Sequence, residues 1–238
     1  MFDHVTIRVS DLAASAAFYS TVLAREPVGE EYREWDDFSI APAEEDRPLT
    51  RHLHVAFAAP SRDEVDAFWR RGVEAGYDSD GEPGLRPQYH PDYYGSFLLD
   101  PDGNSAEACC GFRKGGDSSI DHVWVGVQDL GESLRFWQVV APVLGLGVSE
   151  PREERFHVFG SGRSFALVAD GRPPTEHVHL AFPVADDETV AEFHRVATAA
   201  GFRDNGGPGE RPEYHAGYVG AFVLDPDGNN VEAVNHNR

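Results

Sequence analysis

Lysine is almost absent from this chain, and cysteine is scarce. Its 238 residues include one lysine, Lys114, and two cysteines, which are the neighbours Cys109 and Cys110, and the formal net charge is −21. Such an acidic protein repels nucleic acid and anionic membrane surfaces, so neither is an expected partner. Adjacent cysteines cannot join distant parts of the chain, which favours a reduced, cytoplasmic protein.

Long hydrophobic runs are also missing. No window approaches the 18 uninterrupted apolar residues expected of a membrane span. The N-terminus opens directly on a strand pattern and lacks the anatomy of a signal peptide. Apolar residues make up 41% and aromatic residues 11% of the chain, which suffices for ordinary globular cores. We therefore expect a globular protein, monomeric or homodimeric.

An internal repeat is the strongest feature of the sequence. Residues 81–107 (GEPGLRPQYHPDYYGSFLLDPDGNSAE) match residues 206–232 (GGPGERPEYHAGYVGAFVLDPDGNNVE) at a constant offset of 125. A repeat of this length sets the domain count. We predict an N-terminal domain at 1–113, a Gly/Ser-containing linker at 114–119 and a C-terminal domain at 120–238.

The periodicity within each half predicts an α+β fold. Alternating strands are expected at 4–9, 52–58, 122–127 and 177–183, and each precedes an amphipathic helix. Ser10 or Asp11 can cap the first helix, and Ser61 begins a capping box for the second. A Gly/Pro-rich loop is expected at 79–92, before a hairpin at the Asp-Pro-Asp-Gly turn. The pattern corresponds to four βαβββ modules in two domains.

Two histidines and one glutamate recur in each half on predicted strands. Two imidazoles and a carboxylate can form a facial triad that leaves positions on an octahedral ion open. Because both halves repeat these residue types, the sequence predicts a metal site in each. The candidate ligands are His4, His54, Glu107, His122, His179 and Glu232.

The stretches around these residues resemble the vicinal oxygen chelate superfamily. They read DHVTIRVSDLAASAAFY, HVAFAAPSRDEVDAFWRRGVEAG and LLDPDGNSAE in the first half, and IDHVWVGVQDLGESLRFW, HLAFPVADDETVAEFHRVATAAG and VLDPDGNNVE in the second. That group includes glyoxalase I, extradiol dioxygenases, fosfomycin-resistance enzymes, methylmalonyl-CoA epimerase and bleomycin-binding proteins. The resemblance implies two tandem glyoxalase-like domains whose curved mixed sheets surround metal or ligand cavities.

The resemblance places the family's metal ligands on the six candidate residues. Glyoxalase I uses a further glutamate on the last strand of the first module, but residues 38–40 and 163–167 contain no carboxylate, and Asp36 and Asp37 come too early in the pattern. The family also permits two pairings of modules. Either each half holds its own site, or His4 joins His179 and Glu232 while His122 joins His54 and Glu107.

A Tyr-His-x-x-Tyr pattern precedes each glutamate-bearing hairpin. The histidines could act as acids or bases and the tyrosines as hydrogen-bond donors, or the loop could simply be a rigid packing element. The candidate catalytic residues are His90, Tyr93, His215 and Tyr218.

Four further residues are candidates for binding substrate. His52 and His177 lie two residues before a candidate ligand, on the same face of a predicted strand, and are assigned to the cavity rim. Trp124 replaces Thr6 on the cavity face, so we expect the two sites to be inequivalent. His236 is expected at the surface, and Cys109 is expected to be a packing residue.

These features favour a metal-dependent enzyme that acts on a small molecule with adjacent oxygen atoms. The sharpest version is a non-haem dioxygenase with Fe²⁺, while Mn²⁺, Ni²⁺ or Zn²⁺ would also suit the ligands. A glyoxalase-type lyase or isomerase is one alternative. A metal-free drug-binding protein of the bleomycin-binding type is another.

Overall fold

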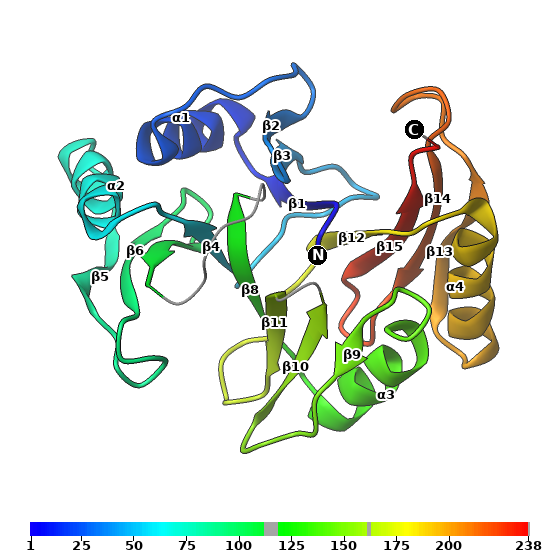
Figure 1. Ribbon diagram of the computed structural model, residues 1–238. Coiled ribbons are helices and arrows are strands. Elements are labelled where there is room, and N and C mark those ends of the chain that lie inside the picture. Colours follow the sequence, from blue (N-terminus) through cyan, green and yellow to red (C-terminus); the bar gives the residue numbers. More distant parts are fainter. Residues whose placement is uncertain (112–118, 161–162, 238) are drawn as a thin grey trace. The chain divides into compact units, whose positions relative to one another are not determined.

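The computed structural model describes residues 1–111, 119–160 and 163–237 and confirms four consecutive modules (Figure 1). The first module contains β1 (His4–Val9), α1 (Leu12–Leu23), β2 (Arg33–Trp35) and β3 (Phe38–Pro42). The second contains β4 (His54–Ala58), α2 (Arg62–Glu74), β5 (Ser79–Leu85), β6 (Tyr94–Leu99) and β7 (Ser105–Cys110). Before β2, Val28 forms only an isolated bridge with Glu34. The first module therefore has two strands after its helix rather than the three of the predicted βαβββ pattern.

The second half repeats this order. The third module contains β8 (Ile120–Gly126), α3 (Leu130–Val140), β9 (Gly147–Val148), β10 (Arg155–Gly160) and β11 (Arg163–Val168). The fourth contains β12 (His179–Pro183), α4 (Asp187–Ala199), β13 (Arg203–Glu210), β14 (Val219–Leu224) and β15 (Asn230–Asn235). The expected linker at 114–119 lies, except for Ser119, outside the described residues.

Side-chain caps fix where the helices begin. The Asp11 carboxylate accepts hydrogen bonds from the backbone N–H groups of Ala13 and Ala14, so Asp11 rather than Ser10 is the N-cap of α1. Ser61 accepts from the N–H of Glu64 at the start of α2, which is one of the two bonds of the predicted capping box, while the Glu64 carboxylate accepts from Arg71. These bonds satisfy N–H groups that have no partner within the helix.

The chain forms two compact units. One consists of residues 1–6 and 124–238, which we call the split unit, and the other consists of residues 7–123, which we call the continuous unit. The division falls within β1 and within β8, so each of these strands contributes residues to both units. The units therefore divide the chain differently from the sequence halves 1–113 and 120–238.

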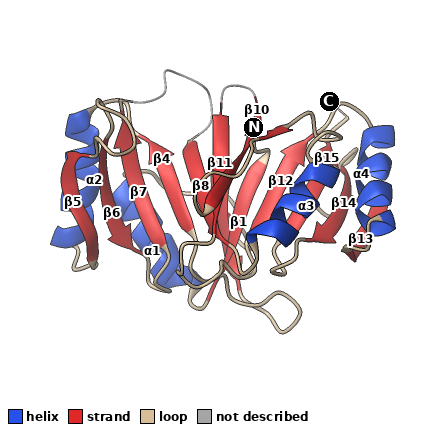
Figure 2. Cartoon of the chain, turned by 90° about the horizontal axis from the view of Figure 1, so that it is seen from below, coloured by secondary structure: helices blue, strands red, loops and turns tan. Residues whose placement is uncertain are grey.

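Within each unit, four neighbouring strands form a sheet with one helix packed against it, and the next strand in that sheet is the start of β1 or β8. In the split unit the order is β13, β14, β15, β12 and then the start of β1, and α4 lies against β13 and β14 (Figure 2). In the continuous unit the order is β5, β6, β7, β4 and then the start of β8, with α2 against β5 and β6. The strands are mixed: β12 and β15 are parallel, as are β4 and β7.

The prediction of one loop over 79–92 is wrong for its first part. Residues Ser79–Leu85 form β5, antiparallel to β6, with register shifts after Ser79 and Gly81. A Cβ at Gly81 would press on the ring of Phe97 in β6, so glycine permits this pairing. The glycines and proline that suggested a loop belong to an irregular edge strand.

Two strands also begin later than predicted. β4 starts at His54 and β12 at His179, whereas strands were expected from His52 and His177. The backbone at His52 and His177 has φ values of +57° and +60°, in the left-handed region. Strand alternation therefore does not reach these two histidines, and the prediction that they share a strand face with the ligand candidates is wrong.

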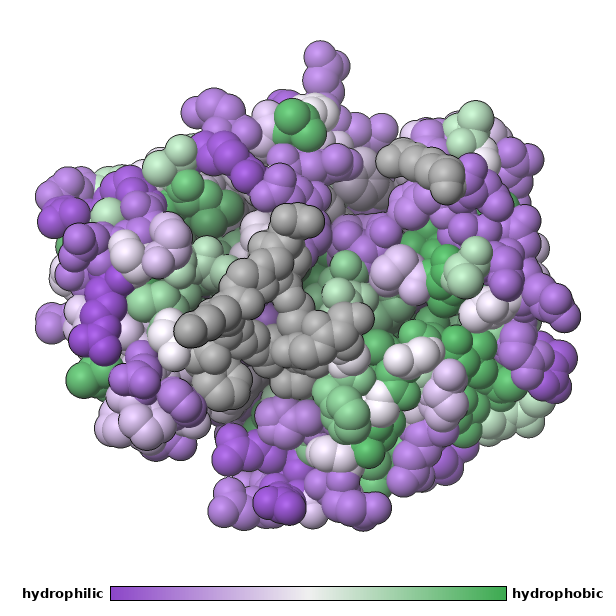
Figure 3. Space-filling model, in the orientation of Figure 1, coloured by the Kyte–Doolittle hydropathy of each residue, from purple (hydrophilic) through white to green (hydrophobic). Residues whose placement is uncertain are grey.

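Hydrophobic side chains form the interior, and few large ones are exposed. The exposed set among the described residues is Val28, Val73, Leu85, Tyr89, Phe159 and Tyr214. Hydrophilic residues cover most of the outer parts of the face in Figure 3. In the described part of the chain, no helix is both long enough and apolar enough to cross a membrane.

Candidate metal centres

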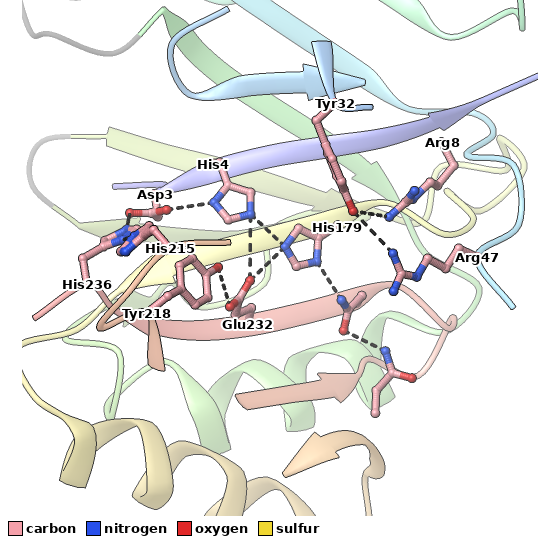
Figure 4. A network of polar contacts seen from close by, with 12 residues as sticks. Asp3, His4, Arg8, Tyr32, Arg47, His179, His215, Tyr218, Glu232 and His236 are labelled. Atoms are coloured by element: carbon pink, nitrogen blue, oxygen red, sulfur yellow. Dashed lines mark hydrogen bonds and ion pairs between the residues drawn. The ribbon is translucent and has the colours of Figure 1, made fainter. Parts of the chain in front are cut away.

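Three predicted ligands converge in the split unit (Figure 4). The Nε2 atoms of His4 and His179 lie 3.0 Å apart, and Oε2 of Glu232 lies 3.0 Å from Nε2 of His179 and 3.8 Å from Nε2 of His4. One nitrogen or oxygen atom from each of the three side chains lies within 4.8 Å of the others. This spacing is that of groups that can share one metal ion.

Strand register explains the convergence. His4 on β1 lies opposite Ala181 on β12, and Ala181 lies opposite Glu232 on β15. His179, two residues before Ala181, therefore points to the same face. The small side chain of Ala181 leaves space between the histidine and the glutamate, and Thr6 pairs with His179 on the same side of β1.

The continuous unit holds a matching group. Nε2 of His54 lies 3.0 Å from Oε2 of Glu107, and Nε2 of His122 lies 3.6 Å from the same oxygen. His54 is paired with Ser105 and Ala56 with Glu107 across the parallel strands β4 and β7. A small alanine therefore again leaves space between the histidine and the glutamate. Of the two pairings left open by the sequence, the structure has the exchanged one.

An aspartate holds the outer nitrogen of the first histidine in each group. Oδ2 of Asp3 lies 2.8 Å from Nδ1 of His4, and Oδ1 of Asp121 lies 2.9 Å from Nδ1 of His122. A carboxylate at Nδ1 accepts the proton there and leaves the Nε2 lone pair directed at the centre of the group. Both histidines are thus oriented as metal ligands are.

The second histidine of each group is held by a residue on the adjacent strand. Nδ1 of His54 lies 3.2 Å from Oγ of Ser105, whose hydroxyl donates to Asp80 and can therefore accept from His54. Nδ1 of His179 lies 2.7 Å from the amide nitrogen of Asn230. Metal coordination by Nε2 of His179 requires Asn230 to present its amide oxygen to Nδ1 instead, which is a rotation of that amide by half a turn.

A tyrosine occupies the other oxygen of each glutamate. The hydroxyl of Tyr93 donates to Oε1 of Glu107 at 2.8 Å, and that of Tyr218 donates to Oε1 of Glu232 at 2.7 Å. Burial, together with the adjacent glutamate, raises the pKa of each tyrosine hydroxyl, so both remain donors. One glutamate oxygen is therefore fixed, and the other faces the two histidines.

Glycines make room for these buried pairs. A Cβ at Gly95 would clash with Oε1 of Glu107, and a Cβ at Gly220 would clash with Oε1 of Glu232. Both glycines lie two residues after the tyrosine that donates to the same glutamate. Glycine at this position is therefore part of the site.

The electrostatics of the split-unit group favour a cation. Burial raises the pKa of Glu232 to about 7, although His4 and the Tyr218 hydroxyl oppose the shift. Burial also acts to raise the pKa of Asp3, but the contacts with His4 and His236 outweigh it, and the net effect lowers that pKa. A cation at Oε2 of Glu232 would stabilise the ionised form of this buried carboxylate.

The repeated loop histidines differ in their surroundings. Nδ1 of His90 accepts a hydrogen bond from the backbone N–H of Asp92, 3.3 Å away. His215 instead stacks on His236, with their ring nitrogens 2.8 Å apart. His236 is only 29% exposed in its side chain and reaches Asp3, so the prediction that it is a simple surface residue is wrong.

Packing explains why the Arg-Pro-x-Tyr-His loop repeats. The Arg86 guanidinium lies 5.4 Å from the centre of the Phe97 ring and donates to the backbone oxygen of Glu82. Arg211 lies at the same distance from the ring of Phe222. The two interpretations of the loop are therefore compatible, since it is packed tightly and also carries the tyrosine donor.

The remaining substrate-binding candidates lie at different depths. Thr6 is buried beside the split-unit group, opposite His179. Trp124 is half-buried, with the Arg172 guanidinium 5.7 Å from its ring centre. His52 is exposed and His177 half-buried, each just before a ligand-bearing strand.

Cys109 packs as expected. It is 2% exposed and clusters with Ala56 and Tyr93, while the equivalent cluster contains Val234. Burial raises the pKa of its thiol, which keeps it protonated. Cys110 is also a free thiol.

Sequence reasoning missed several supporting residues. Asp3 and Asp121 precede the first histidine of each group, and Gly95 and Gly220 face the glutamates. The internal repeat could have revealed them. Asp3 and Asp121 are 118 residues apart, as are the histidines that follow them, and Gly95 and Gly220 are 125 residues apart, as are the two glutamates.

Comparisons with known proteins agree with this architecture. The model of the Glyoxalase/Bleomycin resistance protein/Dioxygenase superfamily matches residues 1–108 and again residues 119–233. No curated protein matches the chain at the sequence level.

Solved structures support the same fold. Glyoxalase I from Zea mays aligns with a TM-score of 0.70 at 17% identity, covering 99% of this chain and 92% of the maize chain. A putative dioxygenase from Bacillus subtilis subsp. subtilis str. 168 aligns with a TM-score of 0.64 at 13% identity, covering 100% of this chain and 85% of that one. Identities this low show a shared fold only.

Proposed function

Since the chain belongs to the Glyoxalase/Bleomycin resistance protein/Dioxygenase superfamily, we propose that it is a metal-dependent enzyme with a 2-His-1-Glu centre in each compact unit. Its substrate would be a small organic molecule that presents two adjacent oxygen atoms. With both described cysteines free, we also propose a cytoplasmic protein, monomeric or homodimeric.

One observation carries this proposal: the same three donor atoms converge twice. In each group two Nε2 atoms and one Oε2 atom face one another, while the opposite atom of every ligand side chain contacts a neighbouring residue. A drug-binding protein without metal has no need of six side chains oriented in this way. The donor set of imidazole and carboxylate suits Fe²⁺ best in this arrangement, with Mn²⁺, Ni²⁺ and Zn²⁺ as other candidates.

The metal would supply Lewis-acid chemistry and positions for adjacent substrate oxygens. The chain's own residues hold the ligands. Tyr93 and Tyr218 fix one oxygen of each glutamate, so that carboxylate cannot rotate freely and its other oxygen faces the histidines. Asp3 and Asp121 orient one imidazole in each group.

The strand sequences favour a dioxygenase-type reaction over glyoxalase chemistry. Glyoxalase I draws a fourth ligand from the last strand of a first module, and the corresponding strands here are β3 (FSIAP) and β11 (RSFALV). Neither strand contains a carboxylate. Three protein ligands leave more coordination positions for substrate and oxygen than four do.

Metal content and oxygen uptake test the proposal. We expect anaerobically purified protein to contain iron or manganese at one to two ions per chain, and Glu107→Ala and Glu232→Ala each to lose the metal of one unit. The loaded protein should then consume oxygen with catechols or related vicinal-oxygen compounds.

Other outcomes separate the alternatives. Turnover of a thiol adduct of an α-ketoaldehyde without oxygen uptake would indicate glyoxalase chemistry instead. A wild-type protein that takes up no metal after reconstitution with Fe²⁺ or Mn²⁺ would overturn the enzyme proposal, and tight binding of bleomycin by that protein would indicate drug sequestration.

A further inference from the structure

A chain of hydrogen-bonding groups leads outward from the split-unit group (Figure 4). Nδ1 of His4 contacts Oδ2 of Asp3 at 2.8 Å, and the other oxygen of Asp3 contacts Nε2 of His236 at 2.7 Å. Nδ1 of His236 lies 2.8 Å from Nε2 of His215, whose Nδ1 lies 2.9 Å from the carbonyl oxygen of Ala216. In this series of hydrogen bonds the imidazoles of His236 and His215 lie between the Asp3 carboxylate and the Ala216 carbonyl, and both of these groups can only accept.

The ring protons of this pair can be counted. The Ala216 carbonyl requires a proton on Nδ1 of His215, and the Asp3 carboxylate requires one on Nε2 of His236. The contact between the two rings requires exactly one more proton. Three ring protons on two imidazoles amount to one positive charge, because a neutral imidazole carries only one.

We propose that the His215–His236 pair shares one positive charge and positions Asp3, and that Asp3 in turn fixes the ring of His4 as a metal ligand. Both histidines are positioning residues that act through Asp3. The charged groups around the pair are compatible with this: Asp3 is in contact with His236, and Glu232 interacts with His236 electrostatically. The Tyr218 ring packs edge-on against His236, 5.3 Å away between ring centres.

The continuous unit has no equivalent pair among its described residues. The position that corresponds to His236 is Gly111, which has φ +95° and where a Cβ would clash with the backbone oxygen of Asp92. No histidine can therefore take that place without a change of backbone. The carboxylate equivalent to Asp3 is Asp121, which lies near the thiol of Cys109.

This inference rests on the proposed function, because it assigns the two metal centres different outer surroundings. It also gives a physical basis for the inequivalence expected from the sequence. The aspartate that orients the first histidine is itself held by a cation in the split unit. Metal affinity in that unit should consequently depend on a residue that has no counterpart in the other.

The test measures Mn²⁺ dissociation constants one site at a time. Glu107→Ala isolates the split-unit site and Glu232→Ala isolates the other, and His236→Ala and His236→Gln are added to each. In the Glu107→Ala background we expect His236→Ala to weaken Mn²⁺ binding about tenfold, at the lower end of the range for outer-shell partners of metal ligands. Glutamine can still donate to Asp3, so His236→Gln should restore binding to within about threefold.

Two results would overturn the proposal. One is unchanged Mn²⁺ affinity in His236→Ala, and the other is an equal loss in both backgrounds, which would indicate a general effect on folding. Thermal unfolding of each metal-free variant shows whether the fold is intact.

Nitrogen-15 NMR of the metal-free wild-type protein separates this proposal from the proposed function. From the hydrogen-bond pattern we expect both ring nitrogens of His236 to be protonated or exchanging with a protonated form, and Asp3→Asn to abolish that state. A protein that bound no Mn²⁺ at either site would contradict the proposed function but would still show the charged pair. A neutral, single-tautomer His236 would overturn the inference whatever the metal content.

Discussion

Each glutamate has one oxygen held by a tyrosine and the other directed at two histidines, and this division is the decisive feature at the scale of single residues. A carboxylate held by one oxygen presents the other in a fixed direction. The arrangement predicts that the tyrosines control metal binding without contacting the metal.

We expect Tyr218→Phe to weaken metal binding in the split unit by roughly tenfold or more, as loss of an outer-shell partner does elsewhere. The buried Oε1 of Glu232 would lose the hydrogen bond from the Tyr218 hydroxyl, and the carboxylate would be harder to ionise. Isothermal titration with Mn²⁺ in the Glu107→Ala background measures the effect. Tyr214→Phe is the control, because that ring is exposed, and an equal loss in both variants would contradict the prediction.

Gly220→Ala should also disable the split-unit site. Its new Cβ would meet Oε1 of Glu232 and the ring of Tyr218, so the carboxylate must move. We expect metal content to fall to that of Glu232→Ala, measured by elemental analysis after reconstitution. Gly207→Ala, which has nothing within 4 Å of its added Cβ, should retain full metal content.

All six proposed ligands could be named from the sequence because the repeat marks them twice. The residues that orient them could not, since an aspartate before a histidine or a glycine in a strand has many ordinary explanations. His236 was misjudged for a related reason. Its partners, Asp3 and His215, lie 233 and 21 positions away, and no local pattern links them.

At the scale of elements, the Asp-Pro-Asp-Gly turns are the best-defined local structures. Asp225 is buried and accepts hydrogen bonds from the backbone N–H groups of Asp227 and Asn229 and from the Asn229 amide. Asp100 makes the equivalent bonds in the first turn and also accepts from the Tyr19 hydroxyl. These bonds fix the hairpins that carry the two glutamates.

The second turn should make stability depend on pH. Burial raises the pKa of Asp225 to about 7 from its ordinary 3.8, so between these values the folded state keeps a proton that the unfolded chain has lost. The free energy of unfolding should therefore fall as pH rises through this window, by up to roughly 1.4 kcal/mol per pH unit from this group. In Asp225→Asn that contribution disappears.

Urea unfolding at pH 5 and pH 7.5 measures the difference between wild type and Asp225→Asn. We expect the wild type to lose stability relative to the variant at the higher pH. Asp100→Asn should show a difference of the same sign, because burial also raises the pKa of Asp100. A difference that does not change with pH would show that Asp225 ionises normally.

Element order followed from periodicity and capping residues, but two features of the strands did not. β5 and β13 contain glycine and proline, which usually indicate a loop, yet each pairs with its neighbour through irregular registers. The starts of β4 and β12 depend on left-handed backbone at histidine, which sequence pattern does not reveal.

At the scale of the whole molecule, the two proposed metal centres should contribute to stability once they are loaded. A ligand at one hundred times its dissociation constant adds about 2.7 kcal/mol to the stability of the state that binds it. We therefore expect Mn²⁺ to raise the melting temperature in a concentration-dependent manner and a chelator to reverse the rise. The double variant Glu107→Ala/Glu232→Ala should show no Mn²⁺-dependent shift in a thermal scan, and a shift that persists would place the binding elsewhere.

The domain count and the α+β class could be read from the repeat, whereas the pairing of modules could not. Both pairings use the same six residues, so only the three-dimensional path of β1 and β8 decides between them. The halves 1–113 and 120–238 are our proposed units of duplication, and the compact units divide the chain inside those two strands.

The exchanged strands have a consequence for how such a protein could have arisen. Each proposed centre takes two ligands from one half of the sequence and its remaining histidine from the other half. An ancestor consisting of a single half would supply its own first histidine to a neighbouring copy and would need that copy's histidine in return. Such a centre would have required two chains, and the fusion of two genes would have made that dependence internal to one polypeptide.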